Sequence, residues 1–430
     1  MGKKQKDWVE ERNKLGDELR DDYLPISTTF VNAGIFCFGK SAASRYVRQP
    51  EAFRVVGLYC TAPKHHRYTS QNARELNQGP SPQNRTRNIQ YAFDPVDNAT
   101  AKQLSSPFSF LSPENIPLPV FQHANRLVPS SLGVPWPTSF PTTFQSKYWV
   151  EVEERTRAYT QELLALRPGK YQAKYIEAVI DGAVSLLVNA VPMGNLTRLK
   201  SLTKLYVFFF LSDDLVNSNN RVTMVPSHVD GKDEQEPEYT VYNMLAKEFL
   251  SEDFVQGKRL LESVISWISA AQHTPPETFP TLEDYMAYRA SDVGAGMEFA
   301  CDITLSNTDI EAVEHLRSLC EKHFLLTNDL YSYAKEAIAE QEHGDSVLNA
   351  VRVVQRLMNT SENSSKAIVR QVIWDVERQM NEEYERLLQD APKSQLTYAQ
   401  GLIVCAAGNM FFSATCARYA RVVEGSRLHV

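Results

Sequence analysis

Residues 323–336 read HFLLTNDLYSYAKE, and this stretch decides the predicted fold. It carries an amide, a hydroxyl and a carboxylate at a regular spacing of four residues, on Asn328, Ser332 and Glu336. Residues four apart lie on the same face of an α-helix, so these oxygens can bind one hard cation such as Mg²⁺. The apolar residues at 324–325 favour a helix inside the protein over a polar stripe on a surface helix.

Helical periodicity extends outward from this stretch over most of the chain. Apolar residues recur at helical intervals, as at Ile368, Val372, Val376 and Met380, and Thr281 suits a helix cap. No alternating strand pattern with hairpin turns competes in the sequence. The sequence therefore predicts an all-α bundle. The predicted helices are 145–166, 170–191, 197–217, 238–272, 281–304, 309–341, 345–359, 364–389 and 395–423.

The first third of the chain has a different character. Residues 1–135 are rich in Pro, Ser, Asn and Gln and lack sustained periodicity. We expect an irregular amino-terminal extension that wraps a helical domain formed by residues 136–430. Because every candidate site residue lies beyond the extension, deletion of residues 1–100 is expected to leave a domain that folds.

The charge of the chain argues against two classes of partner. Its 430 residues carry a formal net charge of -7, which gives no general attraction to nucleic acid or anionic membranes. The charged segment at 1–20 lacks the apolar core of a secretory signal, and the apolar runs are too short to cross a bilayer. These features predict a cytoplasmic protein and leave monomer and homodimer open.

Asp213 and Asp214 follow an apolar helix, in the stretch FFFLSDDLVNSNN. Tyr206, Phe209 and Phe210 lie on the same helix face as the first carboxylate. Adjacent carboxylates beneath aromatic rings indicate a bound cation, because an uncompensated charge is costly in such surroundings. The alternative for this pair is a capped, solvated helix end before a polar loop.

Hydrogen-bond donors suited to phosphate occur at three further places. Arg289 precedes glycines that cost a helix about 1 kcal/mol each relative to Ala, which indicates a local helix break or close helix packing. Arg418 and Tyr419 form a pair near the carboxyl terminus, and Lys335 precedes Glu336. A guanidinium, a phenol and an ammonium can all donate hydrogen bonds to phosphate oxygens.

Together these features resemble class I terpene synthases, most closely the fungal sesquiterpene type. The motifs follow the family's order, which is an aspartate-rich motif, an arginine sensor of diphosphate, the Asn/Ser/Glu triad and an Arg-Tyr pair. NDLYSYAKE matches the second metal motif at every defining position. The run from Arg289 through Val293 to Gly294 is similar to the family's sensor, linker and helix-break effector. The first motif departs from the family, because Asn217 stands where a third acidic residue is usual.

The resemblance implies a class I terpenoid synthase bundle that uses three Mg²⁺ ions to ionise a prenyl diphosphate, with farnesyl diphosphate expected first, and cyclises the carbocation. Ring faces in a dry cavity stabilise such a cation. The implied metal ligands are Asp213, Asp214, Asn328, Ser332 and Glu336. The implied diphosphate-binding residues are Arg289, Lys335, Arg418 and Tyr419, and the implied catalytic residues are Asp213 and Arg289. The implied cavity residues are Tyr206, Phe209, Phe210, Val293, Phe299 and Phe411.

Three alternatives stay open at this point. A diterpene cyclase would use geranylgeranyl diphosphate with the same residues. A chain-elongating trans-prenyltransferase shares the fold and the metals but needs a second DDxxD motif, and the second motif here is NDxxSxxxE. A non-catalytic helical scaffold would account for the weakened first motif but not for two metal motifs in the family's order.

Overall fold

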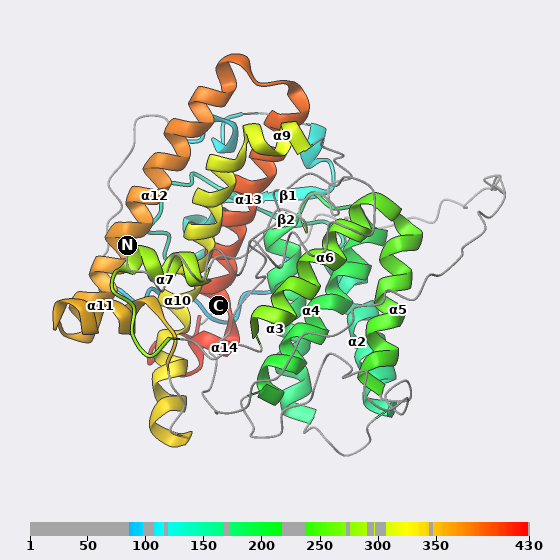
Figure 1. Ribbon diagram of the computed structural model, residues 1–430, viewed down its shortest axis with the longest axis horizontal. Coiled ribbons are helices and arrows are strands. Elements are labelled where there is room, and N and C mark those ends of the chain that lie inside the picture. Colours follow the sequence, from blue (N-terminus) through cyan, green and yellow to red (C-terminus); the bar gives the residue numbers. More distant parts are fainter. Residues whose placement is uncertain are drawn as a thin grey trace, which may run out of the picture.

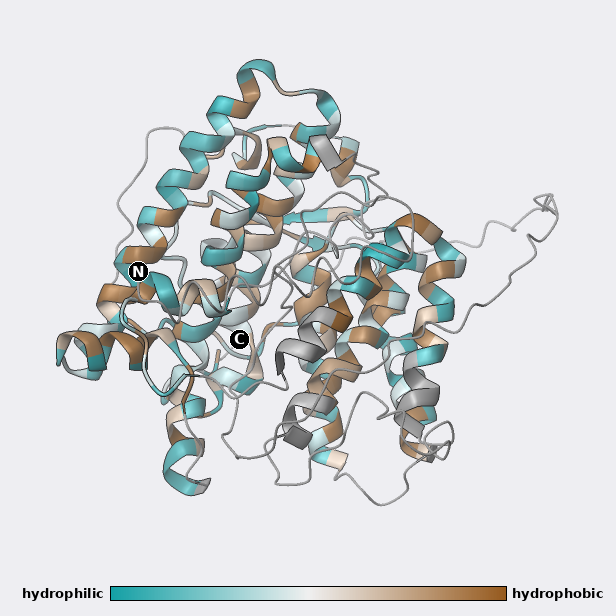
Figure 2. Ribbon diagram, viewed as in Figure 1, coloured by the Kyte–Doolittle hydropathy of each residue, from teal (hydrophilic) through white to brown (hydrophobic). Residues whose placement is uncertain are grey.

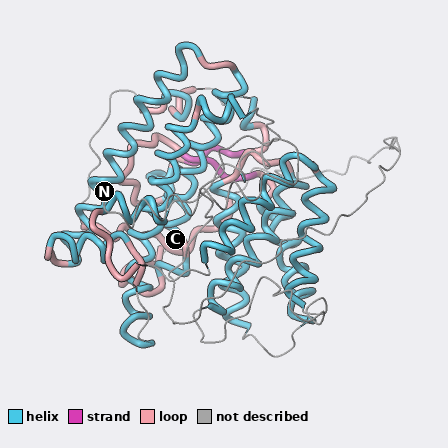
Figure 3. The backbone as a smooth tube through the Cα atoms, in the orientation of Figure 1, coloured by secondary structure: helices cyan, strands magenta, loops and turns pink. Residues whose placement is uncertain are grey.

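The computed structural model describes residues 86–97, 107–115, 119–166, 173–216, 237–271, 276–289, 296, 307–343 and 347–428. Side chains at 212–216, 237–242, 266–271 and 307–308 lie outside this description. Helices dominate the described chain, and only one small pair of strands appears among its residues (Figure 3). The prediction of an all-α bundle is confirmed.

Figure 1 shows the long helices in two groups. The first group contains α2 (Trp149–Leu166), α3 (Ala173–Ala190), α4 (Leu196–Val216), α5 (Pro237–Glu252) and α6 (Phe254–Ala271). The second contains α7 (Leu282–Arg289), α9 (Asn307–Ala312), α10 (Glu314–His343), α11 (Ala350–Met358), α12 (Glu362–Asp390), α13 (Lys393–Thr415) and α14 (Ala417–Ala420). The groups meet where α13 packs against α3, while α13 also packs against α10 and α12.

Helix α13 is the core of the molecule. Every residue from Tyr398 to Ala414 is buried, so this helix is surrounded by protein on all sides. Figure 2 shows the contrast with the outer helix α12, on which hydrophilic residues prevail and apolar ones recur at intervals. The approach of α13 to α3 is close, because a Cβ atom at Gly408 would lie 1.9 Å from the backbone oxygen of Asn189. Glycine at this position therefore allows the two groups to touch.

Three of the predicted helices are divided, and the helix predicted over 345–359 begins only at Ala350. The helix predicted over 309–341 is interrupted at Val313, between α9 and α10. The helix predicted over 238–272 is divided at Asp253, whose side chain accepts a 2.9 Å hydrogen bond from the Gln256 N–H and so caps α6. The helix predicted over 395–423 is divided at Cys416, whose backbone is extended with φ -68° and ψ 118°. The cap predicted at Thr281 is confirmed, because its hydroxyl accepts a hydrogen bond from the Asp284 N–H at 3.0 Å.

A short antiparallel pair of strands, β1 (Ala124–Leu127) and β2 (Thr143–Ser146), was not predicted. Short 3-10 helices precede and separate the strands, at Ser109–Leu111, Pro119–Phe121 and Pro129–Leu132. All four residues of β2 are buried, and β2 packs on α3 and α13. The rings of Phe121 and Phe144 stack with centroids 4.4 Å apart. This irregular part of the chain therefore contributes to the hydrophobic core.

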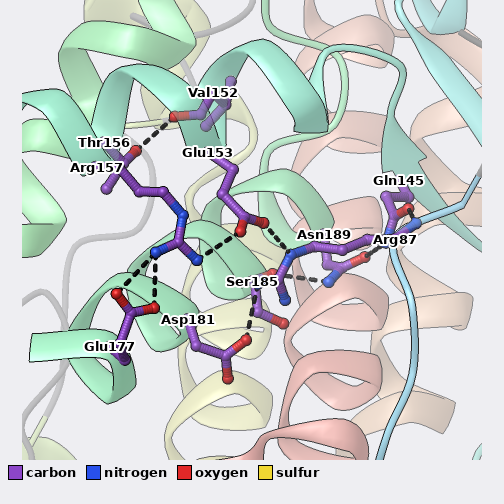
Figure 4. A network of polar contacts seen from close by, with 10 residues as sticks. All are labelled: Arg87, Gln145, Val152, Glu153, Thr156, Arg157, Glu177, Asp181, Ser185 and Asn189. Atoms are coloured by element: carbon purple, nitrogen blue, oxygen red, sulfur yellow. Dashed lines mark hydrogen bonds and ion pairs between the residues drawn. The ribbon is translucent and has the colours of Figure 1, made fainter. Parts of the chain in front are cut away.

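Residues 86–97, here called the amino-terminal segment, lie across the helices rather than apart from them. Figure 4 shows Arg87 between α2 and α3, where it donates to Glu153 at 3.0 Å and to Asp181 at 2.7 Å. Its backbone N–H donates to Gln145 of β2 at 2.7 Å. The bonds to Asp181 and Glu153 raise the pKa of the Arg87 guanidinium, although burial acts in the opposite direction. The segment is thus attached to the first helix group.

The same segment also reaches the second helix group. Asp94 accepts a 2.6 Å hydrogen bond from Arg370 of α12, which also donates to the Tyr331 hydroxyl of α10 at 3.2 Å. Arg370 is 1% exposed, so its charge is compensated inside the protein. The backbone N–H of Phe93 donates to Ala414 at 3.1 Å. The boundary between extension and domain at residue 135 stays a prediction, but residues on both sides of it share one core.

The residues just before β2 hold a further buried charge. The Glu377 carboxylate of α12 accepts hydrogen bonds from the Thr138 hydroxyl at 2.6 Å, the Ser139 N–H at 2.7 Å and His323 at 3.2 Å. Burial alone would raise the pKa of Glu377, but these bonds hold it below its usual range. The contact connects α10, α12 and the irregular part of the chain.

We predict that Gly408→Ala destabilises the protein more than Gly182→Ala. At Gly408 the added methyl group meets backbone of α3 at 1.9 Å, whereas at Gly182 it meets the Phe210 ring at 3.2 Å, and a side chain can shift more easily. Overpacking of this kind costs about 1–3 kcal/mol or more. Urea unfolding followed by circular dichroism measures both, and equal losses would contradict the close approach of α3 and α13.

We also predict that deletion of residues 1–100 lowers the free energy of unfolding, even if the remaining domain folds as the sequence predicts. The deletion removes Asp94 and leaves the Arg370 guanidinium buried without that carboxylate, at a cost of about 3–5 kcal/mol. Deletion of residues 1–84 is the matched control, because it keeps every contact of the amino-terminal segment described above. Equal stability of the two truncated chains in urea would show that the segment is dispensable.

Candidate active site

The triad predicted from the sequence lies on one face of α10. Asn328, Ser332 and Glu336 are 5%, 0% and 9% exposed, so all three are buried. The Ser332 hydroxyl donates to Oε1 of Glu336 at 2.7 Å. Regular α-helix through this stretch brings the side chains together, as their spacing of four predicts.

The short helix α14 joins this triad to the end of α4. The Asn328 amide donates to the Tyr419 hydroxyl at 2.9 Å, which leaves the amide oxygen as the atom suited to a hard cation. The neighbouring Arg418 lies over the ring of Phe210 of α4, at 5.6 Å from its centroid. Asp213 follows Phe210 by less than one helical turn. The helix that carries the first motif therefore ends near the second motif, although the side chains of Asp213 and Asp214 lie outside the described residues.

Arg289 is buried and bound to the motif helix. It is 3% exposed, and it forms an ion pair with Asp329 at 3.0 Å. Its Nε donates to the Tyr285 hydroxyl at 3.2 Å, and this hydroxyl donates to Asp329 in turn. Tyr285 and Arg289 are four residues apart on α7, so both reach the same carboxylate. Arg289 thus contacts the motif helix at Asp329, the residue directly after Asn328.

Sequence reasoning missed two residues of this site. Asp329 is fully buried and also accepts a 2.8 Å hydrogen bond from the Ala350 N–H at the start of α11. Asn349 caps α11 and donates to Oε2 of Glu336 at 3.0 Å. In the sequence, Asp329 could have been found as an acidic residue inside a motif predicted to be buried. Asn349 could have been found as an amide residue directly before an apolar helix. Neither feature identifies the partner.

The electrostatics of the triad suit a cation. Burial raises the pKa of Glu336, and the Asp329 carboxylate adds to this effect. A bound cation would oppose the shift by stabilising the ionised form. Burial also raises the pKa values of Tyr285 and Tyr419 well above the usual value, so both phenols remain neutral donors. The amide, hydroxyl and carboxylate form a donor set that fits a hard metal ion.

Comparison with known proteins agrees with this arrangement. Residues 204–379 match the family model described as terpene synthase family 2, C-terminal metal binding. Terpene cyclase 6 of Gibberella fujikuroi is 30% identical over 77% of this chain and 95% of its own length. Terpene cyclase aneC of Aspergillus aculeatus is 28% identical over 78% of this chain and 83% of its own length. The chain belongs to the terpene synthase family.

This terpene cyclase has the fold expected from its motifs. Aristolochene synthase from Penicillium roqueforti superposes with a TM-score of 0.53, and the match covers 65% of this chain and 99% of that one at 20% identity. A second similar structure is that of 2-methylisoborneol synthase from Streptomyces coelicolor, solved with Mg²⁺ and geranyl-S-thiolodiphosphate. It superposes with a TM-score of 0.50 at 15% identity, and the match covers 63% of this chain and 92% of that one. The predicted class I terpenoid synthase bundle is confirmed. None of the cyclase's described helices is both long and apolar enough to cross a membrane.

The other predicted residues of the cyclase lie in different surroundings. Tyr206 and Phe209 are buried on α4, with ring centroids 6.2 Å apart. Phe411 of α13 lies against Trp136, with centroids 6.3 Å apart, and lines a cavity of about 250 Å³ beside Arg87. Its role as a wall of the substrate cavity stays a prediction. Lys335 is half-buried, and Asn217, Val293 and Phe299 lie outside the described residues.

We predict that Arg289 and Asp329 are energetically coupled. Arg289→Met leaves the buried Asp329 carboxylate without its ion pair, and Asp329→Asn does the same to the Arg289 guanidinium. Each single variant should lower the free energy of unfolding by about 3–5 kcal/mol. The double variant should lose clearly less than the sum. Urea unfolding of all four proteins measures the coupling.

The exposed pair Arg378 and Asp375 provides the matched control, since its side chains are 45% and 55% exposed. Asp375→Asn should change the free energy of unfolding by less than about 1 kcal/mol. Additive losses at Arg289 and Asp329 would contradict the buried pair.

Proposed function

We propose that this enzyme ionises a prenyl diphosphate with the help of Mg²⁺ and cyclises the resulting carbocation with release of diphosphate. One observation carries the proposal. The bond between Asn328 and Tyr419, together with Arg418 over Phe210, brings the second metal motif, the Arg-Tyr pair and the end of α4 to one place. A diphosphate at this place would meet metal ligands and cationic donors from three helices.

The proposed roles of the residues follow from their chemistry. Asn328, Ser332 and Glu336 would hold Mg²⁺ on one side of the diphosphate, and Asp213 with Asp214 on the other, with three ions expected as in the family. When bound, the metal would supply positive charge that stabilises the leaving group. Arg289, Lys335, Arg418 and Tyr419 would donate hydrogen bonds to its oxygens. Among these donors, Arg289 would have to act while bound to Asp329.

The hydrocarbon chain would lie against aromatic walls. Tyr206, Phe209 and Phe210 are the proposed walls on α4, just before the carboxylates. Ring faces attract a cation, and the exclusion of water prevents early quenching of the carbocation. Farnesyl diphosphate is the substrate we propose, in keeping with the motif pattern. The relatives also include a sesterterpene synthase of Neocamarosporium betae, 28% identical over 25% of its length, so longer substrates belong in the test. A cytoplasmic location and a monomeric or homodimeric state remain predictions.

We predict that the purified enzyme converts farnesyl diphosphate to a cyclic terpene in the presence of Mg²⁺ and that chelation with EDTA abolishes the product. Glu336→Gln should reduce turnover at least about 100-fold, which corresponds to about 2.7 kcal/mol of transition-state stabilisation. Gas chromatography with mass spectrometry of the extracts measures both. Geranylgeranyl and geranylfarnesyl diphosphate are tested in parallel.

The exposed residue Glu382 of α12 provides the control, and Glu382→Gln should retain turnover within about twofold. If only one of the longer substrates gave a cyclic product, the proposed length of the substrate would be wrong, but the proposed reaction class would still hold. Absence of product from all three substrates would refute the proposed substrate class, and normal turnover of Glu336→Gln would remove Glu336 from the ligand set.

A further inference from the structure

The Asn349 side chain makes three hydrogen bonds, and two of them end on the metal motif. Its Nδ2 donates to the main-chain oxygen of Asp329 at 2.7 Å and to Oε2 of Glu336 at 3.0 Å. Its Oδ1 accepts from the Val351 N–H at 2.9 Å. The side chain is fully buried, so water does not compete for these bonds. Both amide hydrogens and the amide oxygen are therefore engaged, which fixes the side chain in one orientation.

The orientation of this amide is determined by its neighbours. If nitrogen and oxygen were exchanged, the oxygen would face the carbonyl of Asp329 and the carboxylate of Glu336, which are both acceptors. The NH₂ group would face the Val351 N–H, which is a donor. Only the orientation present satisfies all three neighbours, so the donor toward Glu336 is fixed by the start of α11.

The hydrogen bond from Asn349 restricts the orientation of the Glu336 carboxylate from a second helix, α11. Ser332 donates to Oε1 from α10, and Asn349 donates to Oε2 from α11. Each carboxylate oxygen can accept two hydrogen bonds or metal contacts, so one position on each oxygen stays available. A glutamate side chain has several rotatable bonds, and two fixed donors hold its carboxylate in a single orientation. Partners of this kind orient metal ligands in known sites.

We propose that Asn349 is a positioning residue for Glu336, which orients this carboxylate toward Mg²⁺ and connects it through α11 to the Asp329–Arg289 pair. The inference rests on the proposed function, because Glu336 acts as a metal ligand only there. The competing explanation is that Asn349 does no more than cap α11. A cap can be kept while the donor is lost, because Ser and Thr also cap helices but are too short to reach Glu336.

The experiment compares the parent chain with Asn349→Ser and Asn349→Thr. Isothermal titration calorimetry measures binding of inorganic diphosphate as the Mg²⁺ concentration is varied, and turnover is measured over the same range. We expect both variants to need about 10- to 100-fold more Mg²⁺ for half-maximal binding, and to recover turnover near that of the parent at saturating Mg²⁺. Thermal unfolding without metal reports the stability of each protein.

Asn409→Ser is the matched control. Asn409 is also fully buried and donates to a main-chain oxygen of α10, that of Phe324 at 3.0 Å, but this contact is not to a metal ligand. It should lose thermal stability and keep the Mg²⁺ dependence of the parent. An unchanged Mg²⁺ dependence in folded Asn349→Ser and Asn349→Thr, or failure of both to fold, would overturn the positioning role. Failure of the parent itself to bind diphosphate with Mg²⁺ and to form product would instead refute the proposed function.

Discussion

The burial of the Asp329 carboxylate is the constraint on which the arrangement around the second motif depends. A charge inside a protein is tolerated only when it is paired and hydrogen-bonded. Asp329 meets this requirement with Arg289 and Tyr285 from α7 and with the Ala350 N–H at the start of α11. The carboxylate therefore determines where α7 and α11 sit against α10. It also explains why Arg289 lies inside the protein.

The other faces of α10 are held by further buried polar contacts. Asn409 of the core helix α13 donates to the main-chain oxygen of Phe324, and Arg370 of α12 donates to Tyr331. His323 contacts Glu377, which is also bound by residues before β2. A movement of α10 would break contacts on several sides at once, and each would leave a buried polar group without a partner. The triad is thus carried by a helix that its surroundings hold in place, as an oriented ligand set requires.

The amino-terminal segment extends this restraint across both helix groups. Arg87 is bound to α2 and α3, which pack against the helix of the first motif, and Asp94 is bound through Arg370 to the helix of the second. Such a segment can be irregular and still belong to the core, because its backbone groups find partners in neighbouring elements, as Phe93 does in Ala414. Its composition of turn formers describes its local conformation and says nothing about its burial.

The sequence by itself determined the features that depend on local helix geometry. The spacing of Asn328, Ser332 and Glu336 places them on one face through the 3.6-residue turn, and the order of the motifs indicated the family. It placed Asp213 and Arg289 on helices, but it identified no contact residue within the protein for either.

Only the tertiary structure decided which elements meet. Asn328 contacts Tyr419 across 91 residues, Arg289 contacts Asp329 across 40, and Glu336 contacts Asn349 across 13. Such pairs depend on how the helices pack around α13, and the periodicity of the sequence does not predict that packing. The contacts of the amino-terminal segment with both helix groups could not be predicted for the same reason, because contacts between distant segments depend on the shape and charge of both surfaces together.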